Sequence, residues 1–402
     1  MAKSKFFEII RADHNFEFVG RQRMLLWISG ILVAFSILML PINTYVLKSR
    51  HEPLNFSIDF RGGTEMQIEF RDAVDPGQLR AGLEAGGFKD PEVVKFNETD
   101  HPNTYLVRFA AVSPVSEEQA AKIEARLKTT LGPEVVRKFE FSEGGDKIYL
   151  RFNKAVEPTQ ISDVLKQEGV QTNTVQKFGR PEDNTFEVIL VGLDTEVKRA
   201  LETKLGAGSV QAIPAVESVG ARAGAELRDD GIKSLLAAIL FIMVYIAIRF
   251  DFRYGPGTVV ALLHDAILVM GAFAVTYTEF SLVTVAAILT VIGYSMNDTI
   301  VVFDRIRENS TRQRDKKFDR VVNASINETL SRTVLTSATV FFVTLAMNIW
   351  GSGSIREFGF AMNVGVIVGT YSSIFVAAPI LIWLNDRFYK NVAPAKGAKV
   401  RA

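Results

Sequence analysis

One acidic residue, Asp298, lies inside a long apolar stretch of the chain. Residues 286–296 before it and 299–303 after it carry no charge. A carboxyl group at membrane depth is costly unless it is paired, hydrated or protonated, so such a group is a candidate functional site. The chemistry open to it is the binding and release of a proton.

A cation for this acid is available in Arg332, at the start of a later apolar stretch. Antiparallel spans would bring both residues to a similar depth, and a buried acid opposed by a nearby cation can titrate in a useful range. We therefore expect Asp298 and Arg332 to form a proton relay. The alternatives are a helix-packing contact for Asp298 and an interfacial anchor for Arg332.

Three further polar residues lie in or beside the apolar stretches and are candidates for polar support of this relay. Asn297 precedes Asp298 directly, while His264 and Asp265 are adjacent in an earlier span. A helix–helix hydrogen bond is the simpler interpretation of the His264 and Asp265 pair. Gly365 and Gly369 form a small-xxx-small pair, which favours close helix packing.

Composition excludes several other kinds of chemistry. The 402 residues include no cysteine, which excludes disulfides, thiol catalysis and thiolate metal sites. The four histidines are far apart in the sequence and make no ligand pattern. They are His14, His51, His101 and His264. We expect no metal, no cofactor and no enzymatic activity, and the charge runs lack the aromatic or groove-reading residues of a nucleic-acid-binding protein.

Six stretches are apolar enough to cross a bilayer as helices, for which about 20 residues are needed. They are residues 24–47, 232–248, 257–278, 280–303, 333–350 and 358–384. The first is too long for a typical signal peptide and has no cleavage site, so we expect it to be retained. The predicted fold is a polytopic α-helical membrane protein.

Lysine and arginine in the short connections predict the orientation of the spans. Residues 1–23, the loop after span two, residues 304–332 and the tail 385–402 are basic and fall on one side if the spans alternate. Both termini are therefore predicted to be cytosolic, and residues 48–231 to face the periplasm. Within 304–332, apolar residues at helical spacing predict an interfacial helix attracted to anionic membrane lipid.

The exported segment contains an internal repeat. Residues 70–79 recur as residues 152–161, and the offset of 82 positions continues to Phe96 and Phe178. Each copy reads as strand, helix, strand, strand, helix, with 116–131 and 195–205 as the closing helices. This order predicts a periplasmic α+β domain of two tandem ferredoxin-like modules, 55–132 and 135–217.

Three groups of residues resemble one known family. They are 59–64 after span one, 219–227 before span two, and above all 293–309, Gly-Tyr-Ser-Met-Asn-Asp-Thr-Ile-Val-Val-Phe-Asp-Arg-Ile-Arg-Glu-Asn. Residues 262–265 and 331–333 fit as well. Together they resemble the SecF family of the bacterial SecDF protein-export complex, within the resistance-nodulation-division superfamily. Two features depart from the family: the duplicated exported module, and Ala221 where a proline is usual.

The resemblance implies a multi-pass protein of the bacterial inner membrane that works with SecD. Such a protein uses the proton motive force to assist export after ATP-driven translocation. Its implied partners are SecD, the SecYEG translocon with other accessory subunits, and the unfolded exported polypeptide. The acid and the arginine at the positions of Asp298 and Arg332 would serve proton passage.

Two other functions stay open. One is a proton-coupled small-solute transporter half of the same superfamily, which predicts a roomy binding cavity in the exported modules. The other is a non-transporting translocon scaffold, which predicts that substitutions of Asp298 and Arg332 are tolerated.

Overall fold

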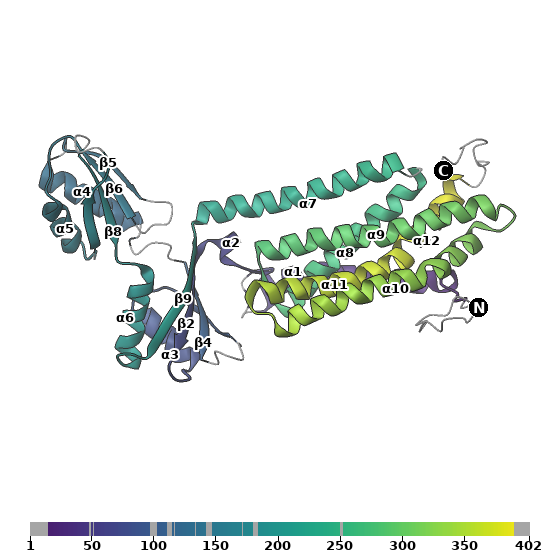
Figure 1. Cartoon of the computed structure of the whole chain (residues 1–402), viewed down its shortest axis with the longest axis horizontal. Helices are drawn as coiled ribbons and strands as arrows, with labels where there is room; N and C mark the ends of the chain where they lie inside the picture. Colours follow the sequence, from purple (N-terminus) through teal and green to yellow (C-terminus); the bar gives the residue numbers. More distant parts are fainter. Residues whose placement is uncertain are drawn as a thin grey trace, which may run out of the picture. The chain divides into compact units, whose positions relative to one another are not determined.

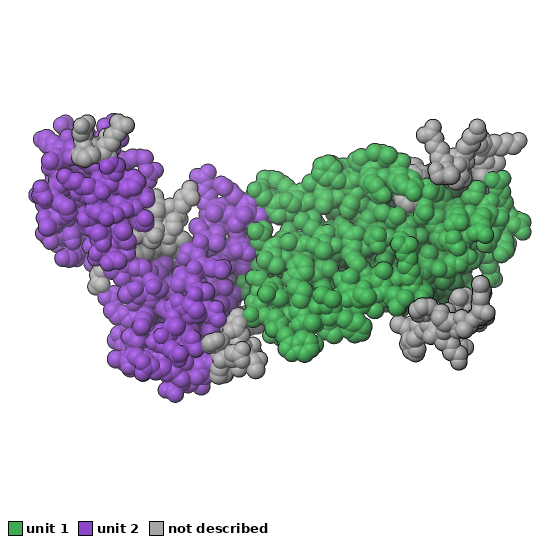
Figure 2. Space-filling model, viewed as in Figure 1, with its two compact units in different colours: residues 1–56, 229–402 green, residues 57–228 purple. Residues whose placement is uncertain are grey.

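The computed structural model describes residues 15–389 except 48–49, 51, 97–102, 111–114, 116, 133, 142–146, 171, 180–183 and 250–251. The basic residues within 1–14, the histidines His14, His51 and His101, and the basic tail from Lys390 lie outside the described part. The chain divides into two compact units, one of residues 1–56 and 229–402 and one of residues 57–228 (Figure 2).

Unit 1 is helical, and the six long apolar helical segments expected from the sequence are present in the described residues. The helices are α1 (Gln22–Pro41), α7 (Ala221–Arg249), α8 (Gly255–Thr276), α9 (Leu282–Arg312), α10 (Phe318–Trp350), α11 (Gly353–Ser372) and α12 (Ala378–Leu384) (Figure 1). The segment Ser373–Ala377 joins α11 and α12 into one span.

Helix α11 is central to the packing of unit 1, where it contacts α8, α9 and α10. Glycines permit its close approach to α9. A Cβ atom at Gly365 would lie 2.1 Å from Val291 Cγ2, and one at Gly369 would lie 2.9 Å from Ser295 Cβ. The small-xxx-small pair therefore lies at a helix contact that admits no side chain larger than hydrogen.

Helix α7 is different because it buries only a narrow seam. Gly231, Ile239 and Ile246 are buried, whereas Phe241 and Ile248 are 72% and 82% exposed. At Gly231 a Cβ atom would lie 3.7 Å from Val285 of α9. The helix begins within unit 2 and continues without a break into unit 1.

The predicted interfacial helix within 304–332 is not a separate element. Helix α9 continues to Arg312 and α10 already begins at Phe318, so only 313–317 connect them. The side chains of Val321, Val322 and Ile326 are buried in the protein, away from a lipid surface.

The residues before α1 contact the first turns of α10. Asn323 Oδ1 accepts a hydrogen bond from the Phe18 N–H at 2.8 Å, and Asn327 Oδ1 accepts one from the Phe16 N–H at 2.8 Å. The segment is thus held to α10 through these two asparagines.

Local sequence fixes the start of α9. Ser281 caps the helix and Thr284 returns a hydrogen bond to the Ser281 N–H, which makes a capping box. The Ser281 hydroxyl also donates to Glu357 Oε2 of α11 at 2.9 Å. The start of α9 is therefore held to α11.

The residues after α1 are fastened to the turn between α8 and α9. The strands β1 (Asn55–Phe56) and β10 (Glu279–Phe280) pair in parallel. Asn43 Nδ2 donates to Ala274 O at 2.8 Å, and the Arg50 guanidinium lies 4.6 Å from the centre of the Tyr277 ring. The part of the chain that leads from α1 into unit 2 is thus held to the turn between α8 and α9.

Unit 2 contains two four-stranded antiparallel sheets. The first has the strand order β3-β4-β2-β9 and the second β5-β6-β8-β7. The strands are β2 (Gly63–Phe70), β3 (Glu92–Phe96), β4 (Thr104–Phe109), β5 (Val136–Phe141), β6 (Lys147–Phe152), β7 (Thr172–Lys177), β8 (Thr185–Leu190) and β9 (Val210–Val219). The helices are α2 (Ile58–Arg61), α3 (Pro76–Ala85), α4 (Glu117–Leu131), α5 (Pro158–Gln167) and α6 (Leu193–Leu205).

The two sequence copies exchange their closing halves, which differs from the expected tandem arrangement. Leu201 and Val197 of α6 belong to the core beneath the first sheet, together with Met66. Ile123 and Leu127 of α4 belong to the core beneath the second sheet. The strand after each of these helices joins the same sheet as its helix. Strand β9, after α6, pairs with β2, and strand β5, after α4, pairs with β6.

The boundaries 55–132 and 135–217 therefore do not describe the two folded modules. The first sheet with its helices is formed by 63–109 and 193–219, and the second by 117–190, which is inserted between them. Each half has the same pattern of apolar residues, so either closing half can complete either sheet. This is the physical reason why the repeat alone did not predict the exchange.

Candidate functional site

Asp298 is buried in unit 1, with 1% of its surface exposed. It lies on α9 and faces α10, where Ser337 Oγ donates to Asp298 Oδ2 at 3.3 Å. This is a long hydrogen bond, and in the described residues it is the one side-chain hydrogen bond that Asp298 forms. A buried carboxyl group has four lone-pair sites, so this one is sparsely satisfied.

The partner of Asp298 is itself shared. The oxygen atoms of Ser337 and Thr370 lie 2.7 Å apart, and Tyr294 OH donates to Ser337 Oγ at 3.4 Å. Thr370 already donates to Val366 O at 2.8 Å. Because a serine hydroxyl has one proton, Ser337 donates to Asp298 or to Thr370 at any moment but not to both.

The structure does not bring Arg332 into an ion pair with Asp298. Within the described residues no nitrogen of Arg332 lies within 4.0 Å of a carboxylate, and its side chain is exposed. Ser337, five residues further along α10, occupies the place expected for the arginine.

Asn297 does not support Asp298 either. It is exposed, one residue away on the helix and therefore turned about 100° from the buried face. It makes no hydrogen bond with other described residues. Sequence adjacency suggested this residue, but neighbours on a helix do not share a face.

A second buried acid, Asp265 on α8, is fully enclosed, with 0% of its surface exposed. Three side chains contact it. Ser295 of α9 and Ser372 of α11 donate to Asp265 Oδ2, the latter at 2.8 Å, and His264 Nδ1 lies 2.9 Å from Asp265 Oδ1. The polar contact expected for His264 and Asp265 thus joins three helices.

His264 extends this cluster towards α1. Its ring stacks on Tyr371, with ring centres 6.3 Å apart and planes inclined by 24°. Tyr371 OH donates to Leu25 O at 2.9 Å. His264 Nε2 is buried and has no hydrogen-bond partner among the described residues.

The sequence did not identify the hydroxyl residues around these two acids. Ser295, Ser337, Thr370 and Ser372 occur among many serines and threonines in apolar segments. A signal was present in their spacing, because Ser295 precedes Asp298 by nearly one turn and is buried on a neighbouring part of α9. What distinguishes these four residues from the other serines and threonines is their contacts with residues of neighbouring helices, and the sequence does not give those contacts.

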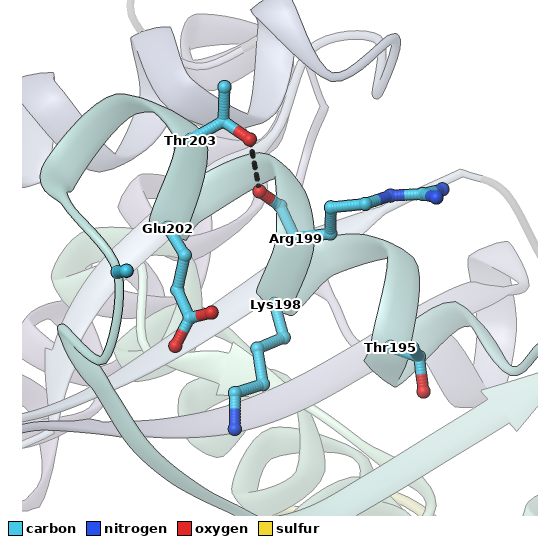
Figure 3. Close-up of a pocket in the computed structure, with 6 residues that line it drawn as sticks. Thr195, Lys198, Arg199, Glu202 and Thr203 are labelled. Atoms are coloured by element: carbon cyan, nitrogen blue, oxygen red, sulfur yellow. Dashed lines mark hydrogen bonds between the residues drawn. The ribbon is translucent and has the colours of Figure 1, made fainter.

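Unit 2 has a surface hollow of about 430 Å³ along α6. Its walls come from that helix and the turn after it, with Lys198, Arg199 and Glu202 on the side drawn in Figure 3. Thr203 Oγ1 donates to Arg199 O at 2.7 Å and so serves the helix itself. One helix and a turn do not enclose a solute, and no His, Asp or Glu cluster for a metal ion occurs in the described residues.

Comparison with known proteins gives a consistent result. The family described as "Protein export membrane protein SecD/SecF, C-terminal" matches residues 199–387, and the "SecD/SecF GG Motif" matches residues 51–74. The chain is 39% identical over 268 residues to the protein translocase subunit SecF of Rickettsia rickettsii, covering 64% of this chain and 86% of the relative.

A second relative covers the whole length. The protein translocase subunit SecF of Koribacter versatilis is 32% identical over 405 residues, which is 96% of each protein. The crystal structure of SecDF from Thermus thermophilus, a translocon-associated membrane protein, matches with 28% identity and a TM-score of 0.60. The match covers 94% of this chain and 39% of the SecDF chain.

These matches include the segments that contain both buried acids and all six long apolar helical segments. The chain is a multi-pass membrane protein and belongs to the family of protein translocase subunits SecF.

Proposed function

We propose that this protein is an accessory subunit of the Sec translocase that works with SecD and uses the proton motive force to assist polypeptide export. Family membership supports the export role. The observation that carries the proton step is Asp298, a buried carboxyl group with one shared hydroxyl partner. In this proposal Asp298 binds the proton, Ser337 is its hydrogen-bond partner, and Arg332 supplies a positive charge on the same helix as Ser337.

Protonation of Asp298 changes the hydrogen-bond pattern around it. When Asp298 is ionised, Ser337 donates to it, and Thr370 lacks that donor. When Asp298 is protonated, it donates to Ser337, and Ser337 is free to donate to Thr370. Each protonation state thus favours a different set of contacts among α9, α10 and α11.

The energy available for such a step is modest. One proton that crosses the full membrane potential contributes about 2.3 kcal/mol per 100 mV. This biases a two-state arrangement only when the states differ in proton affinity. The Ser337 hydroxyl can donate to Asp298 or to Thr370 but not to both. The two arrangements therefore differ in the proton affinity of Asp298 without a large rearrangement.

We assign transmission of the movement to α9 and α7. Helix α7 contacts α9 near Val285 and continues as one helix into unit 2. In this proposal the approach of Gly231 to Val285 passes the movement of α9 to α7. Unit 2 engages the exported polypeptide in this proposal.

The setting of the protein is proposed on the same basis. The strand orders of unit 2 support two ferredoxin-like modules with exchanged closing halves. The basic connections support cytosolic termini, a periplasmic unit 2 and residence in the bacterial inner membrane. SecD, SecYEG and the unfolded polypeptide are the proposed partners, and SecD is supported by the SecDF relative.

The test is export of a precursor protein into inverted membrane vesicles, measured with and without a proton gradient. Asp298→Asn should abolish the gradient-dependent part of export while the variant still assembles with SecD. Asn297→Ala is the matched control on the exposed side of α9 and should retain the dependence. Gradient-dependent export at the wild-type level in Asp298→Asn would contradict the proposal and favour a scaffold.

Arg332 has a separate test because it forms no ion pair in the described residues. Arg332→Lys keeps the positive charge and should retain most gradient-dependent export, whereas Arg332→Ala should lose it. If Arg332→Ala retained as much gradient-dependent export as Arg332→Lys, the role of Arg332 would be limited to an anchor at the membrane interface.

A further inference from the structure

Each sheet of unit 2 has two edge strands in the described residues, and these four edges are not alike. The edges are β3 and β9 in the first sheet and β5 and β7 in the second. An unprotected edge presents unpaired backbone N–H and C=O groups to any other extended chain, so proteins usually block such edges.

Three of the edges carry blocking features. Strand β9 contains Pro214, and a proline removes a backbone donor. Strand β3 follows Pro91 and contains Lys95. Strand β5 has an irregular register before Lys138, whose side chain pairs with Glu140 at 2.5 Å. Prolines, charges and bulges are the usual means of edge protection.

Strand β7 lacks most of these features. Its sequence from Thr172 to Lys177, Thr-Asn-Thr-Val-Gln-Lys, has no proline, glycine or acidic residue, and its one charge is at the end. Its register is irregular only between Thr172 and Thr174. It is the least protected of the four edges.

The register identifies which backbone groups of β7 are free. The Phe178 N–H donates to Thr185 O of β8 at 2.8 Å. Hydrogen-bonded positions alternate along an antiparallel pair, so Gln176 also directs its backbone to β8. Val175 and Lys177 then direct their N–H and C=O groups to the open side.

Neighbouring side chains hold this edge in position. Gln176 Nε2 donates to Glu187 Oε2 at 2.9 Å, and Lys147 Nζ donates to Glu187 Oε1 at 3.0 Å. These contacts hold the pKa of Glu187 below its usual value, the Gln176 hydrogen bond most of all. Val175 packs against the core, so β7 is fixed on both faces before anything binds.

An exposed aromatic residue continues the edge. The Phe178 side chain is 49% exposed, and its ring centre lies 5.5 Å from that of Tyr149. An added strand would extend along β7 and bring one side chain against this aromatic pair. Aromatic rings accept many side chains, so the contact does not demand one sequence.

We propose that the free edge of β7 binds an extended segment of unfolded polypeptide as an additional strand. The occupant follows from the chemistry of the edge, because backbone donors and acceptors with a two-residue period match another extended backbone. Binding through the backbone tolerates varied sequences, which suits a chain in transit. The inference rests on the proposed export function and specifies where unit 2 holds the polypeptide.

The experiment measures binding of a fluorescent ten-residue peptide of alternating threonine and valine to the full-length protein in detergent, by anisotropy. A matched peptide with an N-methyl group on every backbone amide has no N–H to donate from either of its edges. We expect the methylated peptide to bind at least tenfold more weakly. Hydrogen exchange should slow at the Val175 and Lys177 amides when the unmodified peptide is added.

Two variants of one residue separate the backbone from the side chain. Lys177→Pro removes a free N–H without breaking the ladder to β8, and should weaken peptide binding at least tenfold. Lys177→Gln removes the charge but keeps the N–H, and should bind within about twofold of wild type. Unchanged exchange at the Glu187 amide, which faces β7 in the ladder, would show that Lys177→Pro keeps the sheet intact.

Several outcomes would overturn this site. They are tight binding to Lys177→Pro, equal binding of both peptides, protection at β3 or β9 instead of β7, or absence of peptide binding. Self-association that Lys177→Pro abolishes would assign the edge to a second copy of the chain. Asp298→Asn should still bind the peptide, so failure of the edge site and failure of the proton step are distinguishable.

Discussion

The two buried acids of the helix bundle have similar burial and very different surroundings. Asp265 contacts three partners from its own and two other helices, whereas Asp298 receives one long hydrogen bond from a hydroxyl that has another acceptor. Burial alone therefore does not separate a structural acid from a functional one. The number of donors that converge on the acid does.

This difference in surroundings suggests that substitution of the two acids has different effects on stability. Removal of Asp265 leaves the buried Ser295 hydroxyl without its acceptor and leaves Ser372 with only the Gly369 carbonyl, at 3.2 Å, and an unsatisfied buried polar group is expensive. Removal of the charge of Asp298 leaves Ser337 with Thr370 as an alternative partner. One site should govern stability and the other activity.

The largest expected effect is on the folded state and comes from Asp265→Ala. We expect it to lower the free energy of unfolding by about 2–4 kcal/mol, because a buried network loses its central acceptor. Asp298→Asn should stay within about 1 kcal/mol of wild type. Thermal unfolding in detergent measures both, and equal losses would remove the distinction between the two acids.

The next effect concerns the contact that positions both acids. Gly365→Ala places a methyl group within 2.1 Å of Val291 Cγ2, so α11 must move away from α9. Overpacking of this kind costs about 1–3 kcal/mol. Gly293→Ala is the matched control on α9, because nothing lies within 4 Å of its Cβ position. Unfolding temperatures that do not separate these variants would show that the contact adapts easily.

Much of this arrangement was accessible from the sequence, and the reason is local. Apolar segments of sufficient length predicted the long helices, and an acid within one of them identified Asp298. The duplicated pattern predicted two similar sheets. These properties depend on residues close together in the chain, where periodicity and burial cost act directly.

Apart from the expected interfacial helix, which is not a separate element, the errors concern partners. Arg332 was expected beside Asp298 because charge suggested it, but Ser337 lies there, five residues further along α10. Likewise α4 and α6 exchange sheets because both have equivalent apolar faces. Which of two suitable partners is chosen depends on three-dimensional packing, and one sequence does not contain that choice.

A smaller effect tests the shared hydroxyl directly. Thr370→Val removes the competing acceptor, so Ser337 donates to Asp298 in both states. A hydrogen bond is worth about 1 kcal/mol, or roughly fivefold, and we expect gradient-dependent export to fall by about that factor. Thr339→Val, on an exposed face of α10, should have no effect. Unchanged gradient-dependent export in Thr370→Val would show that the transfer of the Ser337 hydrogen bond between Asp298 and Thr370 is not part of the proton step.

The smallest effect concerns a third enclosed carboxylate, Glu187 in unit 2, which resembles Asp265 in having three donors. Gln176, Lys147 and Tyr149 contact it. The Gln176 hydrogen bond, followed by Lys147, lowers the pKa of Glu187 below its usual 4.5 in the folded protein. Its stabilising contribution is therefore complete above about pH 4.5 and is lost as the pH falls through the lower, folded-state pKa.

Acidification should consequently loosen the second sheet in wild type more than in Glu187→Gln, whose side chain does not titrate. Protection factors of the Leu150 and Val188 amides, corrected for the intrinsic pH dependence of exchange, measure this difference. Glu140→Gln is the matched control, because its carboxylate is exposed and a surface ion pair contributes little. If Glu187→Gln loses protection with acid as wild type does, the three donors do not act as a unit. The same reasoning for Asp265, that several donors converging on one carboxylate mark a structural acid, would then lose its support.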